Sequence, residues 1–212
     1  LPADARRAGL SVGPRALVTM QTALVDGLDP FAAAGCPSRP LDGLAAALDA
    51  VLGPDGVIRD EVAVRGERRQ RAVAATRRAA ARVAGLGFPT TLVHGDFHPG
   101  NAALLGDRAV IIDWSDAAIG NPAVDLATWL AWSRDDPEEQ QIAIDGWIEA
   151  WSATGLVEAA ALRGATDALL VVGAAYQVVS YDGILQALEP ATRYTMAGGA
   201  TSFLAQLEAH TV

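Results

Sequence analysis

The stretch that decides the fold is HGDFHPGN at residues 94–101, followed by IDW at residues 112–114. Between them, apolar runs at residues 102–105 and 109–112 flank a Gly-Asp-Arg turn. Two β-prone runs around such a turn predict a β-hairpin. The hairpin carries the first polar motif at its beginning and the second at its end, so folding it back brings the two motifs together.

The chain's densest group of polar side chains lies around this hairpin, within residues 94–125. Its members are His94, Asp96, His98, Asn101, Asp113, Asp116 and Asp125. Asp113 follows an apolar strand, where a carboxylate is held rigidly and can face a cleft. Asp96 and Asn101 lie on the loop before the hairpin, beside Asp113 once the hairpin folds. Oxygen ligands of this kind suit Mg²⁺, which binds one or two carboxylates together with substrate phosphates.

The spacing of the first motif is typical of one catalytic machinery. His94, Asp96 and Asn101 reproduce the frame H-R-D-x-x-x-x-N of the kinase catalytic loop, with Gly in place of Arg. An aspartate at the end of a later strand, here Asp113, matches the metal-binding aspartate of that machinery. A third motif, GNPAVDLA, follows at residues 120–127. With these three ordered motifs the sequence resembles the aminoglycoside phosphotransferase and choline kinase-like family of the protein kinase-like superfamily.

This resemblance implies a role for each matching residue. Asp96 would be the catalytic base that orients the acceptor hydroxyl or accepts its proton, with His94 bracing the loop. Asn101 and Asp113 would hold Mg²⁺ and, through it, the nucleotide. Asp125 would tie its helix to the catalytic loop, and His98 would belong to the loop architecture. Ser115 stands where the family often has an acidic residue, which leaves the roles of Ser115 and Asp116 open.

The resemblance also implies which part of such an enzyme this chain is. The chain contains no lysine and no G-x-G-x-x-G, whereas kinases of this type place both over the nucleotide phosphates. We therefore expect the nucleotide-binding N-terminal lobe to be absent and residues 1–212 to form a single helical C-terminal lobe. In it, residues 1–93 are helices before the catalytic loop, 94–114 are the loop and hairpin, and 115–212 are the helical remainder.

The rest of the chain predicts helices, so the fold class is mainly α with a small β-hairpin. A loop is expected over residues 29–40 and a short β-prone run over 90–93. Asn121 and Asp136, each followed by Pro, look like helix N-caps. Helices are predicted over residues 14–25, 41–52, 61–84, 157–181 and 191–209 from apolar periodicity and flanking Gly or Pro.

Composition limits the class of protein further. The net charge is −9, and residues 94–212 carry 4 Arg against 16 acids, which argues against a nucleic-acid partner. The longest uncharged apolar run, residues 168–181, is shorter than the roughly 20 residues of a membrane span. No signal peptide is evident, and the lone Cys36 cannot form an internal disulfide. These features predict a cytoplasmic protein with no membrane partner, and they leave its oligomeric state open.

The predicted function is transfer of the γ-phosphoryl group of ATP or GTP to a hydroxyl of a small acceptor, aminoglycoside-like or other. Plentiful acidic residues in the second half would suit a cationic acceptor, and an aromatic cage for one could include Trp129, Trp132, Trp147 and Trp151. Helix-core packing is the other interpretation of these tryptophans. Two rival functions remain: a kinase-like module that only binds, and a metal-dependent phosphoesterase using His94, Asp96, His98 and Asp113.

Overall fold

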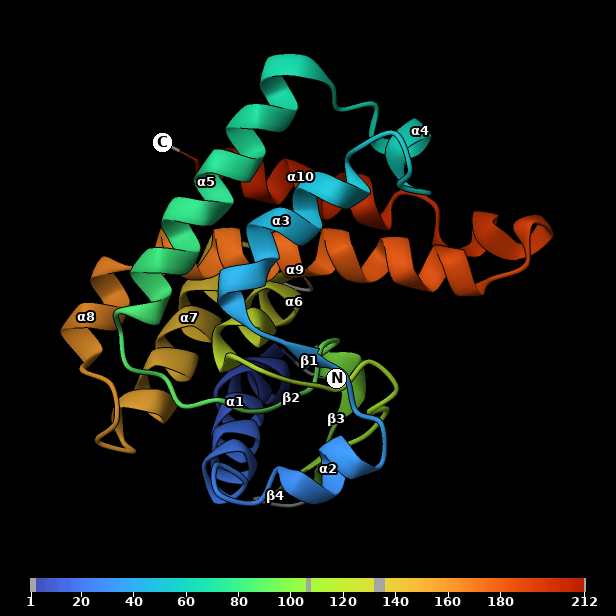
Figure 1. Cartoon of the computed structure of the whole chain (residues 1–212). Coiled ribbons are helices and arrows are strands. Elements are labelled where there is room, and N and C mark those ends of the chain that lie inside the picture. Colours follow the sequence, from blue (N-terminus) through green and yellow to red (C-terminus); the bar gives the residue numbers. More distant parts are fainter. Residues whose placement is uncertain (1–2, 106–107, 132–135, 212) are drawn as a thin grey trace. The chain divides into compact units, whose positions relative to one another are not determined.

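The computed structural model describes residues 3–105, 108–131 and 136–211, and contacts divide the chain into two compact units. Unit 1 comprises residues 1–39 and 86–166, and unit 2 comprises residues 40–85 and 167–212. Helices dominate both units, with short strands in unit 1 (Figure 1). This confirms the predicted fold class, mainly α with a small β-hairpin.

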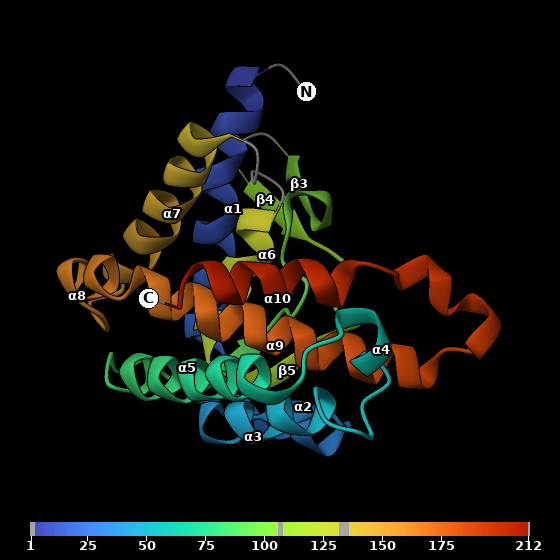
Figure 2. The same cartoon turned by 90° about the horizontal axis from the view of Figure 1, so that it is seen from above.

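Unit 1 is built on α1 (Ala3–Ala23) and α7 (Pro137–Ser152), which lie side by side (Figure 2). Three short strands form one sheet in the order β1-β5-β2, in which β1 runs parallel and β2 antiparallel to β5. The strands β3 and β4 form a separate antiparallel hairpin. The other elements of this unit are α2 (Asp29–Ala33), β1 (Ser38–Arg39), β2 (Thr91–Val93), η1 (Pro99–Asn101), β3 (Ala102–Leu105), β4 (Arg108–Ile111), β5 (Ala118–Gly120), η2 (Pro122–Val124), α6 (Asp125–Ala131) and α8 (Ala159–Gly164).

Unit 2 contains helices only among its described residues. Its elements are α3 (Leu41–Val51), α4 (Arg59–Val62), α5 (Gly66–Ala84), α9 (Thr166–Ala187), η3 (Pro190–Met196) and α10 (Gly199–Ala209). The helices α3 and α5 pack together, and α10 lies along α9, where the rings of Tyr181 and Phe203 are 6.0 Å apart. By length and composition α9 could cross a membrane, but 78% of its most apolar window is buried inside the protein. Such burial is typical of the core helix of a soluble protein.

Several local predictions are confirmed. The hairpin, the strand within residues 90–93 and the helix over residues 41–52 are present, the last as α3. The Asn121 side chain accepts a hydrogen bond from the backbone N–H of Ala123 at 3.0 Å, although a 3₁₀ turn precedes α6. Asp136 caps α7 by accepting hydrogen bonds from two backbone N–H groups. Each of these features depends on neighbouring residues, which is why the local sequence predicts it.

The predicted start of the first helix is wrong, because α1 begins at Ala3 and contains Pro14 in its interior. Proline has no N–H, so it leaves the carbonyl four residues earlier, that of Leu10, without its helical donor. The indole Nε1 of Trp129, in α6, donates to this carbonyl at 3.2 Å. A tertiary contact therefore replaces the hydrogen bond that Pro14 removes from α1.

Three other predicted boundaries also differ from the structure. The range 61–84 is divided into α4 and α5, because Ala63 ends α4 in a left-handed conformation with φ of +49°. Within α4, the Glu61 carboxylate accepts a hydrogen bond from the N–H of Gly198, the residue before α10, at 3.0 Å. The range 157–181 is divided into α8 and α9, and the Thr166 hydroxyl donates to carbonyls at the end of α8. The range 191–209 becomes η3 followed by α10, and the predicted loop over 29–40 includes α2 and β1.

Candidate functional site

The two polar motifs meet at the open end of the β3–β4 hairpin. The register pairs Ala102 with Ile111, and the N–H of Ile112 donates to the carbonyl of Asn101 at 2.9 Å. This bond extends the ladder by one residue pair beyond the strands. Asn101 and Asp113 therefore leave the hairpin beside each other, with Asn101 buried and Asp113 exposed.

His94 joins the loop at residues 94–101 to the second motif. Its ring is fully buried, and Nδ1 accepts a hydrogen bond from the N–H of Asp96 at 3.3 Å. The proton therefore resides on Nε2, which lies 2.9 Å from the carbonyl oxygen of Ile112 and donates to it. The ring also packs against Trp114, with centroids 4.6 Å apart. His94 thus fixes Asp96 relative to the residue before Asp113.

Asp96 is half-buried and surrounded by donors. The Asn101 Nδ2 group donates to its carbonyl oxygen at 3.0 Å and lies 3.4 Å from its Oδ2. On the other side, His98 accepts the N–H of Gly100 at Nδ1, which leaves Nε2 protonated and 3.5 Å from Asp96 Oδ2. The hydrogen bond from His98 lowers the pKa of Asp96, against the opposing effect of burial. Asp96 is therefore ionised at neutral pH.

Asp113 has a left-handed backbone conformation, with φ of +60°. A non-glycine residue seldom adopts this conformation, although Asp tolerates it better than most, and such strain clusters at functional sites. The Ser115 hydroxyl donates to Asp113 Oδ1 at 2.8 Å, and the indole of Trp114 donates to the carbonyl of Ile111 at 3.1 Å. These contacts hold the sharp turn that projects the Asp113 carboxylate from the end of β4.

The backbone of Asp116 packs against Gly95 in the loop at residues 94–101. Gly95 has φ of +82°, and a Cβ atom there would lie 2.2 Å from the backbone oxygen of Asp116. Only glycine allows this approach. Burial raises the pKa of the Asp116 carboxyl, and the charges of Asp96 and Asp113 raise it further, while Arg39 acts in the opposite direction. Asp116 therefore belongs to the same cluster of carboxylates as Asp96 and Asp113.

Asp125 holds the backbone at the start of the loop at residues 94–101. It is fully buried at the start of α6, where Oδ1 accepts the N–H of Gly95 at 2.9 Å and Oδ2 accepts the N–H of His94 at 3.1 Å. Burial raises the pKa of Asp125 to about 6, although these hydrogen bonds favour the charged form. The side chain of Gln21 completes the set by donating to Oδ2 at 2.9 Å.

Gln21 is the site residue that the sequence does not reveal. It lies in α1, 104 positions from Asp125, and is fully buried. Its backbone carbonyl also accepts the hydroxyl of Thr91, in β2, at 2.6 Å. No local motif marks Gln21. The only available signal would have been a polar residue on a helix face that otherwise carries Leu17 and Val18 into the core.

Three of the four tryptophans considered for an aromatic cage lie in the described residues, and all three are buried in the core. Trp129, Trp147 and Trp151 are at most 1% exposed, and Trp129 stacks on Phe97 with centroids 4.4 Å apart. This confirms helix-core packing for these three. Trp132 lies outside the described residues.

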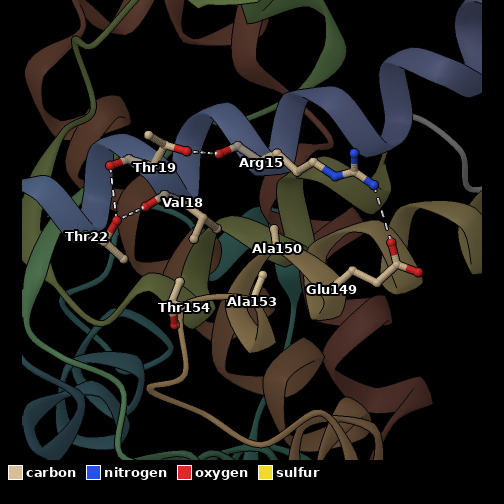
Figure 3. Close-up of a pocket in the computed structure, with 8 residues that line it drawn as sticks. All are labelled: Arg15, Val18, Thr19, Thr22, Glu149, Ala150, Ala153 and Thr154. Carbon is tan, nitrogen blue, oxygen red and sulfur yellow. Dashed lines mark hydrogen bonds and ion pairs between the residues drawn. The ribbon is translucent and has the colours of Figure 1, made fainter.

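Described residues of unit 1 line two hollows. One, of about 700 Å³, is lined by apolar groups such as Phe31, Leu92 and Trp114, and also by Ser115, which contacts Asp113. The other, of about 500 Å³, lies between α1 and α7, and the Arg15–Glu149 ion pair spans it at 3.5 Å (Figure 3). Its threonine hydroxyls donate to backbone carbonyls three or four positions earlier in the chain. Of these two, the first hollow adjoins the site.

The donor set fits Mg²⁺ bound together with phosphate oxygens. Within residues 3–105, 108–131 and 136–211, no three His, Cys, Asp or Glu side chains are grouped to hold a metal ion by themselves. The Asn101 Nδ2 group points to Asp96, which leaves Oδ1 available, and Asp113 keeps Oδ2 apart from its bond to Ser115. One amide and one carboxylate are the sparse protein contribution that Mg²⁺ accepts when substrate phosphates supply further ligands.

Comparison with known proteins assigns the family. The sequence profile of the phosphotransferase enzyme family (APH) matches residues 33–163, which include all three motifs. The chain therefore belongs to the phosphotransferase enzyme family, as its motifs predicted. No curated protein sequence matches it significantly.

A solved structure supports the same fold. The chain is similar to a choline/ethanolamine kinase family protein from Mesorhizobium loti, with a TM-score of 0.55 and 16% sequence identity. The match covers 82% of this chain and 54% of that protein. The chain thus spans about half the length of this relative, whose kinase-like fold it shares.

Proposed function

We propose that this chain is the catalytic and acceptor-binding part of a small-molecule phosphotransferase that uses ATP or GTP. The observation that carries the proposal is the meeting of Asp96, Asn101 and Asp113 at the open end of the hairpin. Phosphoryl transfer needs positioned groups and charge neutralisation rather than a covalent intermediate. This site provides a carboxylate for the acceptor hydroxyl beside oxygen ligands for a divalent cation.

In the proposed reaction, Asp96 orients the acceptor hydroxyl and takes its proton. The hydroxyl oxygen bonds to the γ-phosphorus while the bond from that phosphorus to the β–γ bridging oxygen breaks, which releases the nucleoside diphosphate. Because His98 and Asn101 donate toward Asp96, its carboxylate is ionised and fixed before the acceptor arrives. Positioned general bases of this kind are typically worth about 10²- to 10⁴-fold in rate.

Asn101 and Asp113 are the proposed ligands of Mg²⁺, which neutralises phosphate charge when bound. The chain has no lysine and no G-x-G-x-x-G, so we propose that the groups gripping the nucleotide lie outside these 212 residues. His94 and Asp125 hold the loop and contact neither substrate in this scheme. The isolated chain is accordingly expected to bind nucleotide weakly.

For the acceptor, we propose the apolar hollow that adjoins Asp113 through Ser115. Its walls include the aromatic rings of Phe31 and Trp114, and none of the residues that line it is acidic. Such a wall suits an alcohol with an apolar body better than a polyamine, because a buried cation needs a paired carboxylate. A cationic acceptor, whose charge the carboxylates near Asp96 would meet, is the alternative that the same test distinguishes.

The test is nucleoside diphosphate release by the complete enzyme with a panel of apolar alcohols, aminoglycosides, choline-like amines and sugars. Asp96→Asn should lower kcat by about 10²- to 10⁴-fold with the best acceptor. Asp26→Asn, an exposed aspartate of unit 1, is the matched control and should leave kcat unchanged. Near wild-type turnover by Asp96→Asn would remove this residue from the mechanism.

A second readout locates the acceptor. Cys36 is the only cysteine and lines the apolar hollow, so an acceptor bound there should slow its reaction with a disulfide reagent such as 5,5′-dithiobis(2-nitrobenzoate). Unchanged thiol reactivity at a saturating acceptor concentration would place the acceptor elsewhere. Acceptor binding with no turnover by the wild-type enzyme would favour a module that only binds. Metal-dependent hydrolysis of phosphate esters without an acceptor would favour the phosphoesterase.

A further inference from the structure

Gln21 is a buried amide that contacts the catalytic loop only through another residue. Its Nε2 donates to Asp125 Oδ2, and its carbonyl accepts the Thr91 hydroxyl, so it connects α1 to both α6 and β2. Its own Oε1 is buried and accepts no hydrogen bond from the described residues. A buried amide oxygen without a donor costs stability, and an apolar side chain would avoid that cost. The interaction that distinguishes Gln21 from an apolar side chain is therefore the hydrogen bond that its Nε2 donates to Asp125.

The position of Asp125 depends on that donor. Three N–H groups surround its carboxylate, and those of His94 and Gly95 belong to the loop that the carboxylate must hold. The amide of Gln21 is the side-chain donor in this set, and it comes from a long helix packed along α7. Gln21 thus ties the carboxylate to a rigid element that is independent of the loop.

The loop transmits this constraint to the reacting group. With the N–H groups of His94 and Gly95 fixed, Gly95 keeps its left-handed turn against the backbone of Asp116. The next N–H, that of Asp96, then reaches His94 Nδ1. Rotation of the Asp125 carboxylate would break its hydrogen bonds to the backbone N–H groups of His94 and Gly95 and so move the Asp96 carboxylate. A displacement of about 1 Å in such a site can cost about 10²-fold in rate.

We propose that Gln21 is a positioning residue for phosphoryl transfer, which acts from α1 through Asp125 on the backbone of His94 and Gly95 and so aims Asp96 at the acceptor hydroxyl. The catalytic part of this inference rests on the proposed function. The structural part, that Gln21 holds the loop, does not. The two parts are measured separately.

The first experiment is amide hydrogen exchange on the 212-residue chain. Gln21→Met keeps the length and volume of the side chain but removes the donor, and it should speed exchange of the His94 and Gly95 amides at least tenfold relative to the rest of unit 1. Gln177→Met, at a similarly buried glutamine in α9, is the control for burial. Gln186→Met removes the 2.6 Å hydrogen bond from the side-chain amide to the buried Asp182 carboxylate. It is the control for losing a glutamine–aspartate hydrogen bond outside the site. Neither control should affect these two amides.

The second experiment is steady-state kinetics of the complete enzyme. Gln21→Met should lower kcat at least tenfold with little change in the KM for the acceptor, whereas both controls should retain kcat. If the enzyme transfers no phosphoryl group to any acceptor, the proposed function fails, and hydrogen exchange still decides whether Gln21 holds the loop. A folded Gln21→Met protein with wild-type exchange at His94 and Gly95, or with wild-type kcat in an active enzyme, overturns the proposal.

If Gln21→Met fails to fold, Gln21→Glu keeps the proposal testable. Two carboxylates would then face each other, and a shared proton would restore the donor at low pH. Among the described residues, the titratable side chain that acts on Asp125 is His94. Exchange protection of Gly95 should therefore be lost at pH 8 and return at least tenfold on acidification to pH 5.5. Protection that is equal at the two pH values overturns the proposal.

Discussion

Each of the two units contains a buried aspartate held in a similar way, but the consequences differ. In unit 1, Asp125 accepts the N–H groups of His94 and Gly95 and the amide of Gln21. In unit 2, Asp182 accepts the N–H of Ile58 at 3.1 Å and the amide of Gln186 at 2.6 Å. The first carboxylate holds the loop that carries Asp96, and the second holds the segment between α3 and α4. Both carboxylates therefore fix a backbone segment, and the segment in unit 1 carries the residue proposed as the catalytic base.

The surroundings of the two aspartates differ in the same sense. Around Asp125 the loop has a strained turn at Asp113 and a close backbone approach at Gly95. The ion pair between Arg68 and Glu208 in unit 2, at 2.5 Å, is partly exposed, and pairs of this kind contribute little stability. Strain occurs in unit 2 as well, where Ala63 has a left-handed φ of +49°. What distinguishes Asp125 is that the close approach at Gly95 lies in the loop that its carboxylate holds.

The largest expected effect comes from adding one methyl group in unit 1. Gly95→Ala introduces a Cβ atom 2.2 Å from the Asp116 oxygen at a left-handed φ, so we expect kcat of the complete enzyme to fall at least 100-fold, together with a loss of stability. The matched change in unit 2 is Gly43→Ala in α3, where a Cβ atom meets nothing within 4 Å. That variant should gain roughly 0.5–1 kcal/mol in unfolding free energy and keep its kcat. Similar kcat values for the two variants would remove the distinction between the units.

The next effect concerns pH. Because burial raises the pKa of Asp125 to about 6, above the unfolded value of about 3.9, the folded state holds this proton more tightly than the unfolded state. Its contribution to stability is therefore full below pH 4 and is lost as pH rises to 6. The unfolding free energy of wild type relative to Asp125→Asn should fall by up to roughly 3 kcal/mol between pH 4 and 7. A relative stability that rises with pH in chemical denaturation would mean that the hydrogen bonds outweigh burial.

The smallest effect is expected in unit 2. Asp182→Asn keeps one oxygen acceptor and replaces the other with an amide NH2 group, which would face a donor instead of accepting from it. The variant should therefore lower the unfolding free energy by roughly 1–3 kcal/mol. The kcat of the complete enzyme should stay within about twofold of wild type under conditions where the variant is folded. Denaturant unfolding and steady-state kinetics on the same preparation provide both numbers. A kcat loss as large as the one expected for Gly95→Ala would show that unit 2 also contributes to turnover.

The sequence predicts the parts of the site that depend on neighbours in the chain. The hairpin register follows from two apolar runs and a short turn, so the residue pattern alone is enough to place Asn101 beside Asp113. The caps at Asn121 and Asp136 are local in the same way. The motif spacing also led to the phosphotransferase family, which the family profile confirms.

The sequence fails where the partner is distant. Pro14 looks like a helix start because the donor that compensates for it, Trp129, lies 119 positions away from Leu10. Gln21 is missed for the same reason, because its hydrogen-bond partner, Asp125, lies 104 positions away. Glu61, in α4, likewise accepts the N–H of Gly198, the residue before α10, which is 137 positions away. In each case a side chain satisfies a backbone or carboxyl group that periodicity does not represent.

The two contacts between α6 and α1 have a consequence for how the sequence can vary. Asp125 and Trp129, one turn apart on α6, hold Gln21 and Leu10 of α1. Leu10 and Gln21 are 11 positions apart, which is about three helical turns and places both on the same side of α1. One residue inserted between them would rotate one contact by about 100° relative to the other, so one of the two bonds would have to break. We therefore expect the segment of α1 between Leu10 and Gln21 to tolerate substitutions at outward positions but not the insertion or deletion of a single residue.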